Sequence, residues 1–184
     1  MTYVSNFEIL AENLVPTSIV PSGPQNPFLI QGYFLEISCV APSTSLNFNL
    51  IFDETTSFKQ GGVDSSKILK AQVIDANGDV NVYDNFFDST SNGFLYQPIK
   101  TGQTLIYGVQ CLPQLATVGE DAVALPQAGI GWRGTVRIEN AGTGSLIATP
   151  TQRLVYYAGS NPGKDPVTTA CVYPVPTASG GTAI

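Results

Sequence analysis

The 184-residue sequence contains no histidine, which removes the commonest general base of enzymes. Its absence also excludes Ser-His-Asp and Cys-His nucleophile pairs and histidine-ligated zinc or iron. Catalysis by two carboxylates stays open in principle, but the adjacent pairs Asp53-Glu54 and Glu120-Asp121 have the spacing of ordinary surface acids. We therefore expect a protein that is not an enzyme, with no catalytic residue and no cofactor.

Charged residues are also scarce, at 12% of the chain, which is about half the usual share for a globular protein. The net charge is −6, and the eight lysines and arginines are scattered along the chain. Nucleic-acid binding needs clustered basic residues, so we expect no nucleic-acid partner. A charge-poor surface meets another protein surface at little desolvation cost, which favours assembly.

Long apolar runs are missing as well, and no stretch has the length needed to span a bilayer. The first residues, MTYVSNFEIL, have neither the basic start nor the apolar segment of a standard signal peptide. We expect no membrane span. The expected location is outside the cell or on a cell or virion surface, reached by another route, with assembly in the cytoplasm as the alternative.

The three cysteines, Cys39, Cys111 and Cys171, lie far apart and lack the spacing of a metal site. An odd number leaves at least one unpaired. Cys39 and Cys111 fall inside predicted strands, so a disulfide between them is one alternative. Two buried free thiols are the preferred prediction.

Helical periodicity is nearly absent, and short runs of β-forming residues alternate with Gly, Pro, Asn and Ser. This pattern predicts an all-β protein, an antiparallel β-sandwich of jelly-roll or immunoglobulin type with roughly eight to ten strands. The predicted strands are 3–10, 28–41, 46–53, 68–75, 79–84, 93–99, 104–112, 133–140, 145–150 and 153–158.

Two of these segments carry more specific signals. Asn77-Gly78 predicts a two-residue type I′ hairpin turn, which would place Val73 opposite Val82. The run 28–41 is hydrophobic nearly throughout, which is typical of a strand covered on both faces. Gly32 in this run indicates a bulge or a bend.

Both ends of the chain differ from the middle. Residues 11–27 contain four prolines, which favours an extended connector, and the segment after residue 158 is similar. We predict one domain over residues 1–184, with an N-terminal strand and arm (1–25), a β core (26–158) and an extended C-terminal segment (159–184). The N-terminal strand could pair with its own sheet or with a neighbour's.

These features together predict a self-assembling structural subunit of a filament, tube, surface layer or virion-like shell, whose partners are copies of itself. Strand and arm contacts would join the subunits, and the C-terminal tail would lie on a neighbour. The residues expected to make these contacts are Tyr3, Phe7, Ile9, Val172, Tyr173 and Val175.

The alternative is a lectin-like module that binds a glycan. The sugar contact would come from an aromatic platform of Trp132, Tyr96, Tyr107, Tyr156 and Tyr157, although such aromatics are more often buried. The acidic run 75–88 begins like a calcium-binding loop, but its glycine and its final residue are wrong for that motif. We therefore expect no metal site, with Asp84 and Asp88 as weak candidates for calcium.

Overall fold

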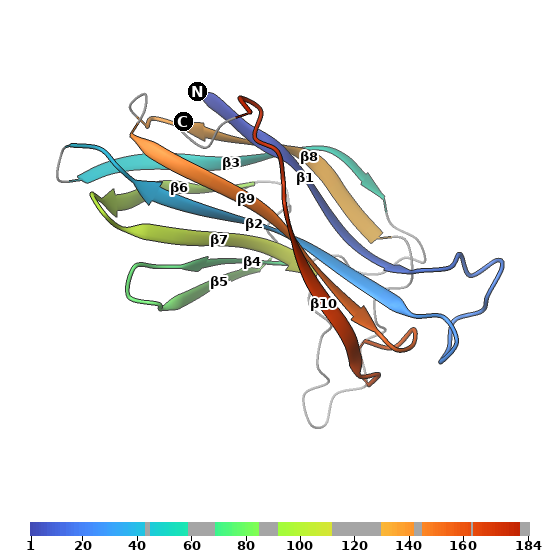
Figure 1. Ribbon diagram of the computed structural model, residues 1–184. Helices are drawn as coiled ribbons and strands as arrows, with labels where there is room; N and C mark the ends of the chain where they lie inside the picture. The colour runs from blue at the N-terminus through green and yellow to red at the C-terminus, as the bar shows by residue number, and fades with distance from the viewer. Residues whose placement is uncertain are drawn as a thin grey trace.

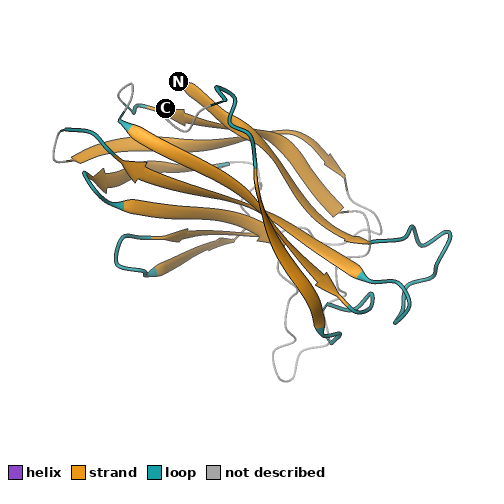
Figure 2. Ribbon diagram, viewed as in Figure 1, coloured by secondary structure: helices purple, strands orange, loops and turns teal. Residues whose placement is uncertain are grey.

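The computed structural model describes residues 1–42, 45–58, 69–84, 92–111, 130–141, 145–162 and 164–180. These residues form an all-β, antiparallel, strongly curled sheet, and no helix occurs among them (Figure 2). The strands are β1 (Thr2–Asn13), β2 (Phe28–Cys39), β3 (Ser45–Phe58), β4 (Leu69–Ile74), β5 (Val80–Asp84), β6 (Gly93–Lys100), β7 (Thr104–Cys111), β8 (Ile130–Glu139), β9 (Leu146–Tyr157) and β10 (Val167–Pro174).

The sheet branches along strand β2. One edge of β2 pairs with β9 over its whole length. The other edge pairs with β1 over residues 28–31 and with β7 over residues 33–38 (Figure 1). We call β2, β9 and β10 the stem, the strands β1, β8, β3 and β6 the β1 wing, and the strands β7, β4 and β5 the β7 wing.

Gly32 lies at the branch point. A side chain there would have its Cβ 2.7 Å from the Cβ of Gln110 on β7, closer than two carbon atoms can pack. The pairing of β2 with β9 continues through Gly32 without a register shift, so the ladder has no bulge at this residue.

The core lies between the two wings, which gives a sandwich-like arrangement. Core residues on β2 therefore change side at the branch: Phe28 and Ile30 face the core in one half, and Tyr33, Leu35 and Ile37 face it in the other. Along an ordinary strand, every second residue faces the core. On β2 the set of core-facing residues changes from even to odd numbers because each half of the strand belongs to a different wing.

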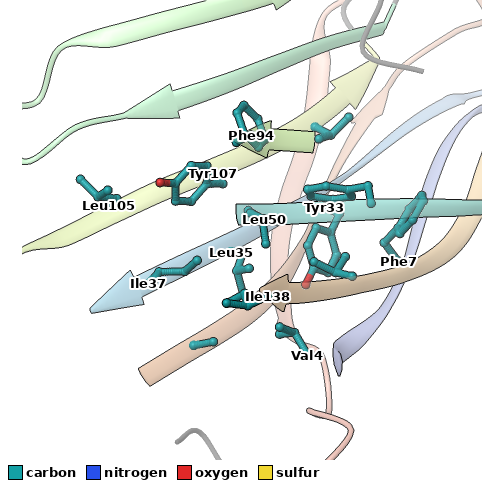
Figure 3. Packing of buried hydrophobic residues seen from close by; sticks show 14 of the residues in the cluster. Val4, Phe7, Tyr33, Leu35, Ile37, Leu50, Phe94, Leu105, Tyr107 and Ile138 are labelled. Carbon is teal, nitrogen blue, oxygen red and sulfur yellow. The ribbon is translucent and has the colours of Figure 1, made fainter. Parts of the chain in front are cut away.

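Aromatic rings join the two wings across the core (Figure 3). The ring of Tyr107 on β7 lies 5.0 Å from that of Phe94 on β6 and 5.9 Å from that of Phe48 on β3. Near the branch, Tyr33 and Phe52 stack edge-to-face at 5.7 Å. Such pairs add to the stabilisation that their burial provides.

The predicted Asn77-Gly78 hairpin forms, but its register differs by one residue. Val73 pairs with Asn81, and Val82 pairs with Gln72. The difference arises because the side chain of Asp75 accepts hydrogen bonds from the N–H groups of Asn77 and Asp79 at 2.8 and 3.0 Å. This favours a three-residue loop, with Gly78 at φ +87° closing it.

The N-terminal arm is not an extended connector. β1 lies inside the sheet between β2 and β8, so the predicted core of 26–158 leaves out one of its central strands. The proline-rich loop that follows β1 is folded around Asn26, whose amide donates to the carbonyls of Val15 and Val20, each at 2.8 Å. The carbonyl of Pro27 accepts from Leu14 at 2.8 Å and closes the loop.

The two predicted strands 145–150 and 153–158 are one continuous strand, β9. Pro150 is tolerated inside β9 because its backbone N and C=O point away from β2. Its carbonyl accepts a hydrogen bond from the N–H of Val175 at 2.9 Å. The missing N–H of Pro150 therefore removes no hydrogen bond from the ladder with β2.

Candidate assembly edge

The branched sheet ends in three outer strands among the described residues: β5, β6 and β10. An outer strand presents unpaired N–H and C=O groups that can pair with another chain. Two of these strands carry features that hinder such pairing. β5 has only five residues and ends in Asp84, and β6 contains Pro98 and the irregular residue Tyr96 at φ 53°.

β10 lacks these protections along its middle. It is eight residues long, has the sequence VTTACVYP and carries no charge. Its side chains are exposed on both faces, including Val172 at 59% and Tyr173 at 48%. Both faces are open because β10 lies at the far end of the stem, away from the core between the wings (Figure 1).

The hydrogen bonds show which atoms of β10 point outward. The N–H of Val175 donates to the carbonyl of Pro150, so the pairs further along the ladder that exchange hydrogen bonds are Tyr173 with Gln152 and Cys171 with Leu154. The N–H and C=O groups of the intervening residues, Ala170 and Val172, therefore point away from β9. No other described strand pairs with them.

Polar contacts fix one face of this edge. The side chains of Cys171 and Tyr173 are joined by a hydrogen bond between the thiol and the hydroxyl group at 3.3 Å. Thr168 donates to the carbonyl of Tyr156 at 3.1 Å, beside the bulge where the pairing with β9 shifts between Val167 and Thr169. The regular part of β10 therefore begins at Thr169.

The tail after β10 returns to the chain's own sheet. The N–H of Ala178 donates to the carbonyl of Val4 on β1 at 2.7 Å, and Val175 is bonded to β9 as described above. Its backbone is thus held without a neighbour, which the composition of the tail did not predict.

The predicted assembly residues divide into two groups. Tyr3, Val172 and Tyr173 are exposed, and Val175 is half-buried. Phe7 and Ile9 are buried in the chain's own core, where β1 pairs with β8 at Gly134 and Trp132. The structure removes these two from the candidate contact surface. Sequence reasoning missed Ala170, although an uncharged run rich in β-branched residues between Pro166 and Pro174 is a usable signal.

Trp132 is not a surface residue. It is 3% exposed and belongs to the core, because it lies opposite Ile9 in the pairing of β8 with β1. Among the predicted aromatic platform, Tyr107 is also buried, whereas Tyr96 is 78% exposed. The N–H of Tyr96 donates to the side-chain oxygen of Asn49 at 2.9 Å, which holds this strained conformation.

Of the acidic candidates, Asp53 has an ion-pair partner. Asp53 forms an ion pair with Arg137 at 2.5 Å, while Glu54 is exposed. Asp84 is the last residue of β5 and pairs with Lys70 in the backbone ladder with β4. Asp88 and the pair Glu120-Asp121 lie outside the described residues. Within the described ranges, no three cysteine or acidic side chains gather closely enough to hold a metal ion.

Cys39 and Cys111 are buried free thiols, as preferred from the sequence, and Cys171 is free and half-buried. Burial alone raises the pKa of Cys111, which keeps its thiol protonated and unreactive. Across the parts of the chain with a described structure, none forms a helix suited to crossing a membrane. Comparisons with protein-family models, curated proteins and solved structures found no match for this chain.

Proposed function

We propose that this protein is a non-enzymatic structural subunit that assembles with copies of itself through the edge strand β10. The observation that carries the proposal is an uncharged strand of eight residues, exposed on both faces and with outward-pointing N–H and C=O groups. Soluble proteins usually protect such edges with charges, prolines or bulges in the strand. An edge left open in its middle suits a protein that uses it for pairing.

The composition supports the same proposal. With 12% charged residues, the surface loses little hydration free energy when another subunit covers it. Val172 and Tyr173 supply exposed apolar area beside the backbone edge, and aromatic residues are common at the centres of protein interfaces. We propose that the β10 contact is one of the interfaces of a filament, tube, surface layer or shell outside the cell or on a virion.

The test is sedimentation velocity of the full chain over a wide concentration range, compared with the variant Val172→Lys. A lysine in the middle of an edge strand opposes pairing through charge repulsion and the cost of desolvation. Ile19→Lys is the matched control, because Ile19 is 72% exposed in the loop between β1 and β2. We expect assembly of the wild type and of Ile19→Lys, and its loss in Val172→Lys.

Two further variants test whether the edge strands β5 and β6 take part in assembly. Val80→Lys and Leu95→Lys place the same charge at exposed positions of β5 and β6. They should assemble like the wild type if β10 is the contact. A wild-type chain that stays monomeric at every concentration would overturn the proposal.

A carbohydrate-binding role is the second candidate, and it now depends on Tyr96. This side chain is exposed, and a hydrogen bond to Asn49 holds the backbone that carries it, which suits stacking on a sugar ring. Binding on a glycan array that disappears in Tyr96→Ala would favour this role over assembly.

A further inference from the structure

We propose that β10 pairs antiparallel with the β10 of a second copy, about a two-fold axis that passes beside Cys171. This inference rests on the proposed function and specifies its contact. The partner, the direction of pairing and the register each follow from a different observation.

The partner is the same strand because the other two outer strands are poor acceptors. β5 is short and ends in an acid, and β6 is interrupted by Tyr96 and Pro98. A contact between identical patches has two-fold symmetry, and a two-fold axis perpendicular to the strands makes the paired strands antiparallel. Such a contact joins two copies only, so a larger assembly uses a second interface elsewhere on the subunit. The chain's net charge of −6 opposes self-association, but none of the residues of β10 is charged.

The register follows from the two ends of β10. At one end of β10, the backbone of Pro174 faces away from β9 but has no N–H to donate. At the other end, the bulge at Thr168 displaces the backbone N–H and C=O that would face outward. Ala170 and Val172 are therefore the two consecutive outward residues with both a donor and an acceptor in regular geometry. Both exchange their full set of hydrogen bonds only when Ala170 of one copy lies opposite Val172 of the other.

A shift of two residues in either direction is worse. One shift places Pro174 opposite Ala170 of the second copy and loses a donor. The other places Thr168, in the bulge, opposite Val172 of the second copy. The favoured register puts Cys171 opposite Cys171 of the second copy, in a pair without mutual hydrogen bonds.

This register makes a geometric prediction about Cys171. The Cα atoms of such a pair lie about 4.5 Å apart, which is within the roughly 4.4–6.8 Å range of disulfides. On the same face, Thr169 would lie opposite Tyr173 of the second copy. On the other face, Ala170 and Val172 of both copies would form a continuous apolar strip.

The test uses the full chain treated with diamide and analysed on non-reducing gels. Two Cys171 thiols would lose two protons and two electrons to diamide, which becomes the hydrazine, and form one disulfide. Cys39 and Cys111 are buried and should not react. The matched control is Ala170→Cys in a Cys171→Ser background. This variant moves the thiol by one residue, so that it can no longer reach the same thiol of the second copy to form a disulfide.

We expect covalent dimers from the wild type and at least tenfold fewer from the control variant. A second readout needs no cysteine chemistry: hydrogen exchange at the N–H groups of Ala170 and Val172 should slow as the protein concentration rises. The N–H groups of Cys171 and Tyr173 already bond to β9 and should change little.

Assembly with equal cross-linking of both variants, or with none, would overturn the register and leave the proposed function standing. The same holds if the N–H groups of Ala170 and Val172 gain no protection in the assembly. Absence of assembly in sedimentation would overturn both.

Discussion

Replacing Gly32 with alanine should destabilise the protein, because the branch point has no room for a Cβ atom. The new atom would lie 2.7 Å from the Cβ of Gln110 and 3.2 Å from the carbonyl oxygen of Val109. Carbon atoms pack at about 3.5–4.0 Å, so a displacement of about 1 Å is needed. β2 is held by β9 on one edge and by β1 and β7 on the other, so its backbone cannot move freely.

The size of the effect combines two contributions. Overpacking a core by a methyl group costs about 1–3 kcal/mol, and removing a glycine from a strand gains roughly 0.5–1 kcal/mol. The expected net loss is about 1–2 kcal/mol of unfolding free energy, or very roughly 2–8 °C in melting temperature for a chain of this size.

Urea unfolding followed by fluorescence would measure the loss, because Trp132 is the only tryptophan and is buried. The matched variant Gln110→Gly removes the opposing Cβ, so Gly32→Ala combined with Gln110→Gly should be more stable than the sum of the two single effects. An unchanged midpoint for Gly32→Ala, or additive effects in the pair, would refute the explanation of the branch.

Three further predictions concern other parts of the chain. Ser5→Ala and Tyr33→Phe should each cost about 1–3 kcal/mol in urea unfolding, because each leaves the other partner of a buried 2.7 Å hydrogen bond unsatisfied. The double variant should lose little more than either single one, and additive losses would contradict this. Tyr96→Gly should stabilise the protein by about 1 kcal/mol in the same assay, because φ 53° is unfavourable for tyrosine; a loss of stability would contradict the strain. Burial raises the pKa of Glu12, with a further contribution from Glu8, so the folded state holds this proton more tightly than the unfolded state does. Stability should therefore fall as the pH rises from the ordinary value of 4.5 through the raised pKa, and Glu12→Gln should raise the thermal midpoint at neutral pH but not below 4.5; an equal effect at both pH values would contradict the linkage.

Much of the fold was predictable because β-strand signals are local. Alternating or continuous β-formers between turn residues identified nine of the ten strands that the structure describes, with β9 divided in two at Pro150. The hairpin at Asn77-Gly78 was predicted for the right reason, but the Asp75 side chain set its register, and a side-chain hydrogen bond of this kind competes with the preference of the dipeptide.

The features that were missed depend on non-local contacts. The change of core side along β2 follows from two different partners on one edge, which no pattern within residues 28–39 could indicate. Trp132 is buried because β8 lies beside β1, far away in sequence. The pairing of β10 was missed because its residues do not alternate and its prolines suggested a tail.

The branch at Gly32 also has a mechanical consequence. A force that pulls on β10 across the sheet would act on the ladder between β10 and β9, and then on the longer ladder between β9 and β2. Beyond β2, the force would divide between β1 and β7. Neither wing would carry the full load, and the aromatic core between them would resist their separation. A subunit built in this way could pass tension from a copy paired at its β10 into both wings, while each half of its sheet carries only part of it.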